Sequence, residues 1–153
     1  MERNVIRKRN AFTLLEIVVV LLVIGVIGGV FIFRLGGVGD QNKMETARGD
    51  LRSIQTALNA YFLNHNSFPA QADWSDDLVN DDPRVLRQVV YDPFRSSTMP
   101  TEYAFNRSPA GAYYVVYSFG PNEIQDITGI NDNGILTGQN VDDIYVTNGR
   151  NFS

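Results

Sequence analysis

The longest apolar run of the chain, from Phe12 to Phe33, limits what the protein can fold into. Apart from glycines, Thr13 and Glu16 are its only polar residues. As an α-helix, the run would extend about 33 Å, which is enough to cross the hydrocarbon core of a bilayer. The preceding residues 1–11 form a basic leader with four basic side chains against one acidic side chain. This charge predicts an N-terminus on the cytoplasmic side of a membrane and a C-terminal part on the other side.

Two simpler interpretations of this run are open. A secretory signal peptide would have a shorter apolar core followed by small residues at a cleavage site, whereas here Arg34 interrupts before the next small residues. A plain single-pass anchor accounts for the length of the run. It does not account for Glu16, because a carboxylate within a spanning helix is costly and is by default a functional hypothesis. Near the start of the helix, that carboxylate could also simply complement the positive end of the helix dipole.

The chain beyond the apolar run first predicts a second helix. Residues 36–41 form either a glycine-rich joint or a plain linker, because each glycine weakens a helix by up to about 1 kcal/mol. Apolar residues then recur every three or four positions from Gln41 to Asn64, which predicts a helix with one buried stripe. That stripe consists of Met44, Ala47, Leu51, Ile54, Leu58, Tyr61 and Phe62.

Strand patterns follow in the second half of the chain. Residues 102–106, 112–119 and 143–147 are β-prone. Residues 108–111 predict a turn that joins the first two strands as a hairpin. Three antiparallel strands packed on the helix stripe give a small α+β domain over residues 42–153.

Two polar segments lie between or beside these elements. Asp82-Pro83 predicts the start of a short helix that continues to Val90. The segment from Gly120 to Asp143 is long for a loop, and such loops are usually functional or disordered. It is rich in Asp, Asn and Gly, which supply the oxygen donors and tight turns that a calcium ion needs. A turn-rich surface loop without an ion is the alternative interpretation.

Composition limits the kinds of partner and chemistry. The full chain has 13 Lys and Arg against 17 Asp and Glu, and the basic leader holds four of the former and one of the latter. The remainder therefore has 9 against 16, a net charge of −7. Such an acidic domain is a poor match for nucleic acid, whose phosphates require basic patches. With no cysteine and one histidine, His65, the chain predicts neither a zinc site nor a nucleophile–base pair, so we expect a protein that is not an enzyme.

Four short motifs carry a resemblance to a known family. Residues 11–16 read Ala-Phe-Thr-Leu-Leu-Glu after the basic leader, and residues 91–94 read Tyr-Asp-Pro-Phe. Residues 117–122 read Tyr-Ser-Phe-Gly-Pro-Asn, and residues 142–144 read Asp-Asp-Ile. Together with the apolar run, these motifs resemble those of the type IV pilin-like proteins, and most of all the major pseudopilin of type II secretion systems.

The resemblance implies roles for three residues at the N-terminus. Prepilin peptidase would cut between Ala11 and Phe12, and the new amine of Phe12 would be methylated. The carboxylate of Glu16 would neutralise the amine of the next subunit during assembly, an attraction that is large only where water is excluded. The family usually has Gly at the position of Ala11.

The resemblance also implies that the 120–143 loop binds calcium. The candidate ligands, carried over by position and joined by backbone carbonyls, are Asn122, Asp126, Asp132, Asp142 and Asp143. Asn122 stands where the family usually has Asp, which removes one charge from the site.

The function implied is that of a structural subunit of a type II secretion pseudopilus. The helix at 12–35 would cross the bacterial inner membrane once, with the N-terminus cytoplasmic and residues 42–153 in the periplasm. The implied partners are further copies of the chain in a helical filament, prepilin peptidase, the minor pseudopilins and the inner-membrane assembly platform. The alternatives are a type IV pilus subunit for adhesion, motility or DNA uptake, and a membrane-anchored binding domain that does not assemble.

Overall fold

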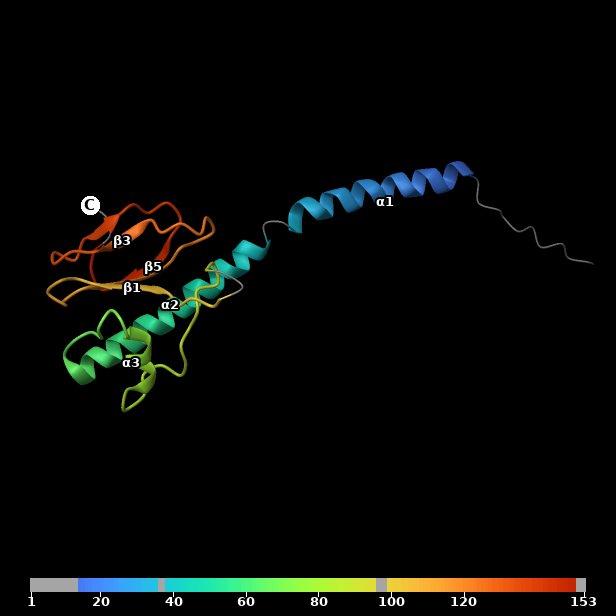
Figure 1. Ribbon diagram of the computed structural model, residues 1–153. Helices are drawn as coiled ribbons and strands as arrows, with labels where there is room; N and C mark the ends of the chain where they lie inside the picture. Colours follow the sequence, from blue (N-terminus) through green and yellow to red (C-terminus); the bar gives the residue numbers. More distant parts are fainter. Residues whose placement is uncertain (1–13, 36–37, 96–98, 151–153) are drawn as a thin grey trace, which may run out of the picture. The chain divides into compact units, whose positions relative to one another are not determined.

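The computed structural model describes residues 14–35, 38–95 and 99–150, and side chains within these ranges except those of 27–35 and Val38 (Figure 1). Ala11 and Phe12, the residues of the expected cleavage, lie outside the described residues. The chain divides into two compact units, residues 1–39 and residues 40–153.

The first unit contains a single described helix, α1 (Leu14–Leu35). Its sequence is almost wholly aliphatic, and Glu16 lies in its first turn, where a carboxylate complements the helix dipole. A helix was predicted for this run, and it is confirmed over the described residues. By length and apolarity, no helix within the described residues qualifies as a membrane span.

The second unit is organised on α2 (Val38–His65), which begins three residues earlier than predicted and includes Gly39 of the expected joint. Its predicted stripe is confirmed at the centre of the helix, where Leu51, Ile54 and Leu58 are at most 1 % exposed. The helix ends at His65, because the next residue, Asn66, has a left-handed φ of 54° and its N–H donates to the carbonyl of Phe62 at 2.7 Å.

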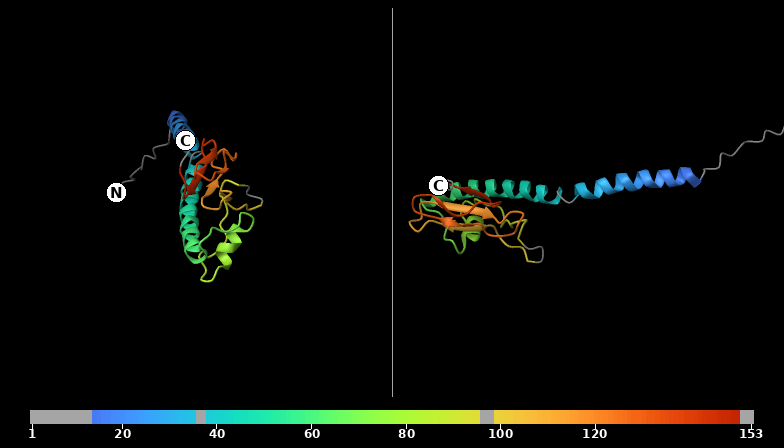
Figure 2. Two further views of the ribbon diagram at one scale, coloured as in Figure 1. Left: turned by 90° about the vertical axis from the view of Figure 1, so that its left-hand side faces the viewer. Right: turned by 90° about the horizontal axis from the view of Figure 1, so that it is seen from above.

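The three predicted strands are confirmed as one antiparallel sheet. They are β1 (Ala104–Arg107), β2 (Tyr114–Ser118) and β5 (Ile144–Thr147), in the order β1-β2-β5. Phe105 pairs with Val116, which in turn pairs with Val146 on β5. The sheet lies on one side of α2 (Figure 2), and the side chains of Phe105, Tyr114 and Val116 join the buried stripe of that helix in one core cluster.

The loop expected from Gly120 to Asp143 contains a β-hairpin in its middle, over residues 127–138. It contains β3 (Ile127–Ile130) and β4 (Leu136–Gly138), which pair antiparallel. Ile127, Ile130 and Leu136 of this hairpin pack with Val115 and Tyr117 on the face of β2 that points away from α2. The α+β domain therefore has three layers: α2, the three-stranded sheet, and the β3–β4 hairpin. Because both of its faces are covered, β2 is buried at every position.

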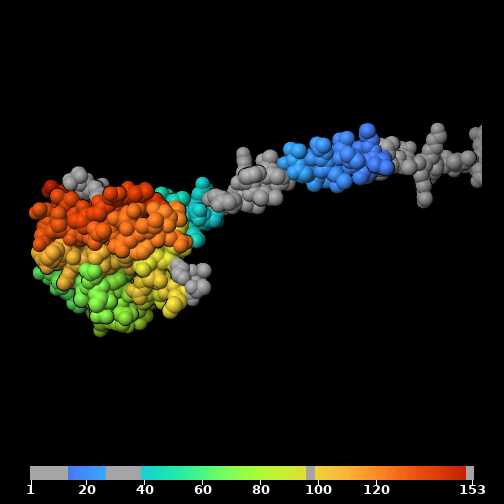
Figure 3. Space-filling model, turned by 45° about the horizontal axis from the view of Figure 1, so that its top comes forward, coloured from blue at the N-terminus to red at the C-terminus, as the bar shows by residue number. Residues whose placement is uncertain are grey.

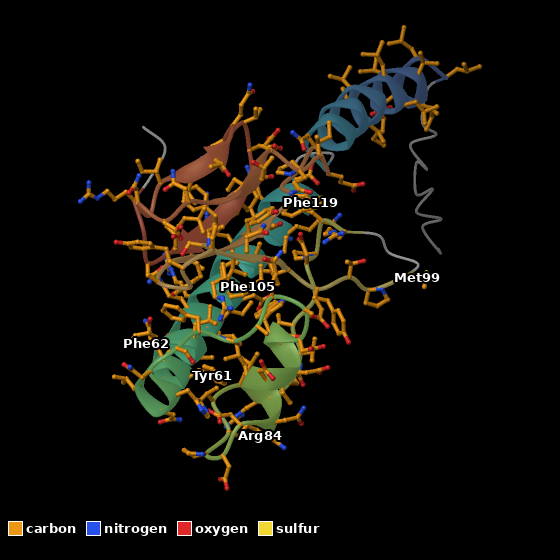
Figure 4. All side chains as sticks on the ribbon, turned by 60° about the vertical axis from the view of Figure 1, so that its left-hand side comes forward. Tyr61, Phe62, Arg84, Met99, Phe105 and Phe119 are labelled. Carbon is orange, nitrogen blue, oxygen red and sulfur yellow. The ribbon has the colours of Figure 1, made fainter. Side chains whose placement is uncertain are left out.

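The prediction of a helix after Asp82-Pro83 is wrong. The short helix of this region is instead α3 (Trp74–Asn80), and residues 82–90 are not helical. Trp74 packs α3 on the sheet, because its buried ring stacks on Phe105 with centroids 5.3 Å apart. Figure 4 labels Phe105 at this core and Phe119 at the end of the sheet where the hairpin begins.

Candidate functional site

The candidate site lies where both ends of the β3–β4 hairpin meet the sheet. Asp126 immediately precedes β3, and Asp142 and Asp143 immediately precede β5. One carboxylate oxygen from each of these three residues lies within 4.8 Å of the others. Asp126 therefore joins two residues that lie 16 and 17 positions further along the chain, and the three form one carboxylate cluster, named here the Asp126–Asp142–Asp143 cluster.

Three oxygens of this cluster are buried and unsatisfied. Among the described residues, Asp126 Oδ2, Asp142 Oδ1 and Asp143 Oδ1 have no hydrogen-bond partner. Asp143 is only 6 % exposed. A buried carboxylate oxygen without a partner is costly, and carboxylates are the ligands that hard cations such as calcium prefer. The donor set of the cluster therefore fits a divalent cation.

The electrostatics of Asp143 agree with this geometry. Burial raises the pKa of the Asp143 carboxyl, and the neighbouring charges of Asp126 and Asp142 raise it further. The N–H groups of Ile127 and Asp126 oppose this shift, because both donate to Asp143 Oδ2, at 2.7 and 3.0 Å. One oxygen of Asp143 thus holds the backbone of the hairpin, while the other is buried without a hydrogen-bond donor from the described residues.

The remaining two residues of the expected ligand set, Asn122 and Asp132, are not part of this cluster. Asn122 donates its backbone N–H to Asp142 Oδ2 at 2.9 Å, while its own Oδ1 accepts from the N–H of Ile124 at 2.6 Å. Asp132 lies in the turn between β3 and β4, and its Oδ1 accepts from the N–H of Ala110 at 2.7 Å. The structure therefore brings together Asp126, Asp142 and Asp143, places Asn122 beside Asp142, and gives Asp132 a separate partner.

Two glycines allow the backbone to approach the cluster. Gly120 has φ +66°, and a Cβ on it would lie 2.3 Å from the carbonyl oxygen of Asp142. Gly138 has φ +101°, and a Cβ on it would lie 2.3 Å from the carbonyl oxygen of Asp126. Any side chain at either position would displace a residue of the cluster.

Asp92, which the sequence analysis treated only as part of the Tyr-Asp-Pro-Phe motif, holds the backbone next to this site. Its buried carboxylate accepts from Phe94 N–H at 3.0 Å, Ser118 Oγ at 2.7 Å and Phe119 N–H at 3.1 Å. The Asp-Pro-Phe segment is thereby fixed to the end of β2, immediately before Gly120. An Asp-Pro pair beside an aromatic residue was visible in the sequence, but its partners were not, because they lie 26 and 27 positions away.

Comparison with known proteins decides the family. Residues 34–136, which include α2, the sheet strands β1 and β2 and most of the β3–β4 hairpin, match the family model described as "Type II secretion system (T2SS), protein G". The chain belongs to the type II secretion protein G family. Its matched region begins after the N-terminal motif at residues 11–16, so this motif and the family match are separate observations.

Curated relatives of the protein G family agree with this assignment. The Type II secretion system core protein G of Pseudomonas aeruginosa is 32 % identical over 73 residues, which cover 48 % of this chain and 51 % of that relative. That of Aeromonas hydrophila is 31 % identical over 90 residues, covering 56 % and 63 %. That of Pectobacterium carotovorum is 26 % identical over 126 residues, covering 75 % and 78 %. The chain thus spans about half to two-thirds of the length of the first two relatives, and no solved structure matches it.

Proposed function

We propose that this protein is a structural subunit of a type II secretion pseudopilus, with no catalytic activity of its own. The observation that carries the proposal is the family match across α2 and the sheet. The similar curated proteins bear the name core protein G of this system, which favours a pseudopilus over a type IV pilus. The apolar α1 with Glu16 in its first turn supplies the surface through which copies of the chain would assemble.

The proposal includes maturation and location. Prepilin peptidase cuts after Ala11, Phe12 is N-methylated, and α1 holds the subunit in the inner membrane with residues 42–153 in the periplasm. A basic leader could not be packed into a water-excluded bundle of apolar helices, so its removal precedes assembly. The partners are further copies of the chain, the minor pseudopilins and the inner-membrane assembly platform.

The experiment that tests this proposal is the intact mass and N-terminal sequence of the protein after expression with and without a prepilin peptidase. We expect a mature chain that begins at methylated Phe12 only when the peptidase is present. Ala11→Gly serves as a positive control for processing, because it restores the residue that is usual in the family. A chain that keeps residues 1–11 in both the wild type and this variant would overturn the proposal.

A bound calcium ion is the second part of the proposed function. The Asp126–Asp142–Asp143 cluster would hold it, with three buried oxygens that have no other partner among the described residues. Calcium would supply the positive charge that these carboxylates lack, and it would stabilise the folded domain by mass action. We expect millimolar calcium to raise the melting temperature of the wild type. The same calcium concentration should leave the melting temperature of Asp142→Asn almost unchanged. An equal rise in the melting temperature of both proteins would argue against the cluster as the calcium site.

A further inference from the structure

Six large apolar side chains within the described part of the α+β domain are exposed to solvent. Two of them, Phe62 and Leu63, lie at the C-terminal end of α2. The other four are 49 to 75 % exposed and are named here the apolar rim: Tyr91, Met99, Ile124 and Val141. Exposed apolar side chains that gather in one place, rather than singly, mark a surface that contacts another apolar phase.

A hollow of about 380 Å³ brings three residues of the apolar rim to the start of α2. Its lining includes Lys43, Tyr91, Pro100 and Glu123. Lys43 lies in the second turn of α2, so the hollow belongs to the N-terminal end of this helix. Met99 immediately precedes Pro100 in the chain. Ile124 immediately follows Glu123, so both exposed side chains flank the same hollow.

The fourth residue of the apolar rim, Val141, lies beside the loop that holds Ile124. It precedes Asp142, whose Oδ2 accepts from the N–H of Asn122 at 2.9 Å. The Oδ1 of Asn122 accepts in turn from the N–H of Ile124 at 2.6 Å. Figure 3 shows yellow and orange surface of the domain next to the cyan start of α2. The apolar rim therefore lies at one end of the domain, around the start of that helix.

Two basic side chains lie over aromatic rings beside the apolar rim. Lys43 Nζ is 5.5 Å from the ring centroid of Phe94, and the guanidinium carbon of Arg95 is 4.2 Å from that of Phe119. Such long side chains cover apolar surface with their stems and keep their charge at a polar boundary. Tyrosine and basic residues beside aliphatic ones are typical of a protein surface at the boundary between a membrane and water.

The charges around the hollow are balanced. Two cations and two carboxylates line it, those of Lys43, Arg95, Asp92 and Glu123. The chain without its basic leader also has a net negative charge, which gives it no general attraction to anionic headgroups. Contact with lipid would therefore come from insertion of the aliphatic and aromatic side chains of the apolar rim, without a requirement for anionic lipid.

The length of the chain between the helices keeps the apolar rim close to the end of α1. α2 begins at Val38, three residues after α1 ends at Leu35. Three extended residues span at most about 11 Å, and Lys43 lies about 8 Å further along α2. Lys43 is thus within about 19 Å of the end of α1 at any angle between the helices. Leu63, in contrast, is about 38 Å along α2 from Val38.

We propose that the apolar rim rests on the membrane that holds α1, with its four side chains in the interfacial layer of the bilayer. This inference rests on the proposed location of α1 in the inner membrane, and it assigns a lipid contact to the α+β domain. A subunit that has not joined a filament is then held by two contacts, the helix that spans the bilayer and the rim that lies on it. Entry into a filament requires the rim to leave the lipid.

The test uses spin labels on single cysteines, which is direct because the chain has no cysteine of its own. The full chain is placed in phospholipid nanodiscs at one copy each and at a fixed calcium concentration, with Ile124→Cys or Leu63→Cys labelled. Oxygen concentrates in the bilayer and a nickel chelate stays in water, so the ratio of their collision rates with a label reports its depth. The ratio should be several-fold higher for the label at position 124 than for the label at position 63.

A matched pair of variants assigns this depth to the apolar rim. In the chain labelled at position 124, Tyr91→Ser combined with Met99→Ser should lower the ratio to that of the label at position 63. Leu63→Ser removes an equally exposed apolar side chain at the other end of α2, and it should leave the ratio at position 124 unchanged. Unchanged melting temperatures would show that each variant is folded. High salt should also leave the ratio unchanged, because the charges around the hollow are balanced.

A third label, on Val23→Cys within α1, separates the possible failures. If this label lies in the bilayer while positions 124 and 63 give equal ratios, the inference is overturned and the location of α1 stands. If this label is also exposed to the nickel chelate, the proposed location fails and the inference fails with it. Slow collisions of both reagents at position 124 would mean that protein and not lipid covers the rim, which would overturn the inference as well.

Discussion

At the scale of single residues, the domain contains two kinds of buried carboxylate. Asp92 has three donors for its two oxygens and acts as a fixed structural joint. Asp143 has two backbone donors on one oxygen and no hydrogen-bond partner from the described residues on the other. Because a buried charge is tolerated only when it is compensated, the first is complete within the protein, whereas the second has an oxygen that the proposed cation would compensate. Both residues are aspartates, so only their hydrogen-bond partners distinguish the role of Asp92 from that of Asp143.

The joint at Asp92 gives the first prediction. Asp92→Asn should destabilise the domain by about 1–3 kcal/mol, because an amide group would face the donor of Phe119 or Ser118 and leave it unpaired. The free energy of unfolding in urea would measure this effect. Asp76→Asn, on the exposed face of α3, is the matched control and should stay within about 0.5 kcal/mol of the wild type. Equal stabilities for the two variants would contradict the role of Asp92.

Asp81 predicts how stability depends on pH. Chiefly because of the hydrogen bond with His65 Nε2 at 2.7 Å, the pKa of the Asp81 carboxyl is lower than its ordinary value of 3.8. The folded state therefore binds this proton less tightly than the unfolded chain. Its stabilising contribution is complete above pH 3.8 and is lost as the pH falls through the lowered pKa.

The measurement is the unfolding free energy between pH 5 and about pH 2, the range in which carboxylates of this kind titrate. The wild type should lose stability with falling pH more steeply than Asp81→Asn, which has no carboxyl to protonate. Parallel pH profiles for the two proteins would show that the contact between Asp81 and the end of α2 contributes nothing.

At the scale of elements, the same residue type has opposite effects in a helix and in the hairpin. Gly49 lies within α2 with open space around its Cα, so Gly49→Ala should stabilise the domain by about 0.5–1 kcal/mol. Gly138 has a left-handed φ, and a Cβ on it would clash with the carbonyl oxygen of Asp126, so Gly138→Ala should destabilise the domain by about 2 kcal/mol or more. Thermal unfolding with and without calcium measures both. Gly138→Ala should also lose the shift that calcium causes, and its retention would contradict the coupling of Gly138 to the cluster.

The elements differ in how far the sequence could predict them. The stripe of α2 and the strands β1, β2 and β5 were predictable, because periodicity and β-propensity are local signals. The β3–β4 hairpin was missed because its strands are only four and three residues long and contain glycines. Asn133-Gly134 between two apolar runs was the one signal that could have revealed it. The convergence of Asp126 with Asp143 was suggested only by resemblance, since it depends on how β3 and β5 come together in the fold, where Asp143 accepts from the backbone N–H groups of Asp126 and Ile127.

At the scale of the whole molecule, the two units carry different parts of the assignment. The family match begins at residue 34 and so rests on the α+β domain. The expected processing and assembly rest on residues 11–16 and on α1, which precede that match. Assembly through α1 and calcium binding by the domain should therefore be separable: a variant of the cluster changes the stability of the subunit, whereas a variant of α1 changes only whether subunits join.

Glu16 gives the prediction that tests this separation. Its carboxylate lies in the first turn of α1, where the amine of a neighbouring Phe12 would be stabilised only in a water-excluded contact between subunits. Glu16→Gln keeps the shape of the side chain and removes its charge, so membrane insertion and the calcium-dependent melting temperature should equal those of the wild type. The yield of sedimentable filaments in cells that contain the secretion system should fall at least tenfold, the effect expected when an ion pair worth about 1.4 kcal/mol or more is lost at each contact. Leu21→Ile, a volume-conserving change on the same helix, should assemble as the wild type does. Normal filaments from Glu16→Gln would show that the charge of Glu16 is dispensable, and that α1 associates through apolar packing alone.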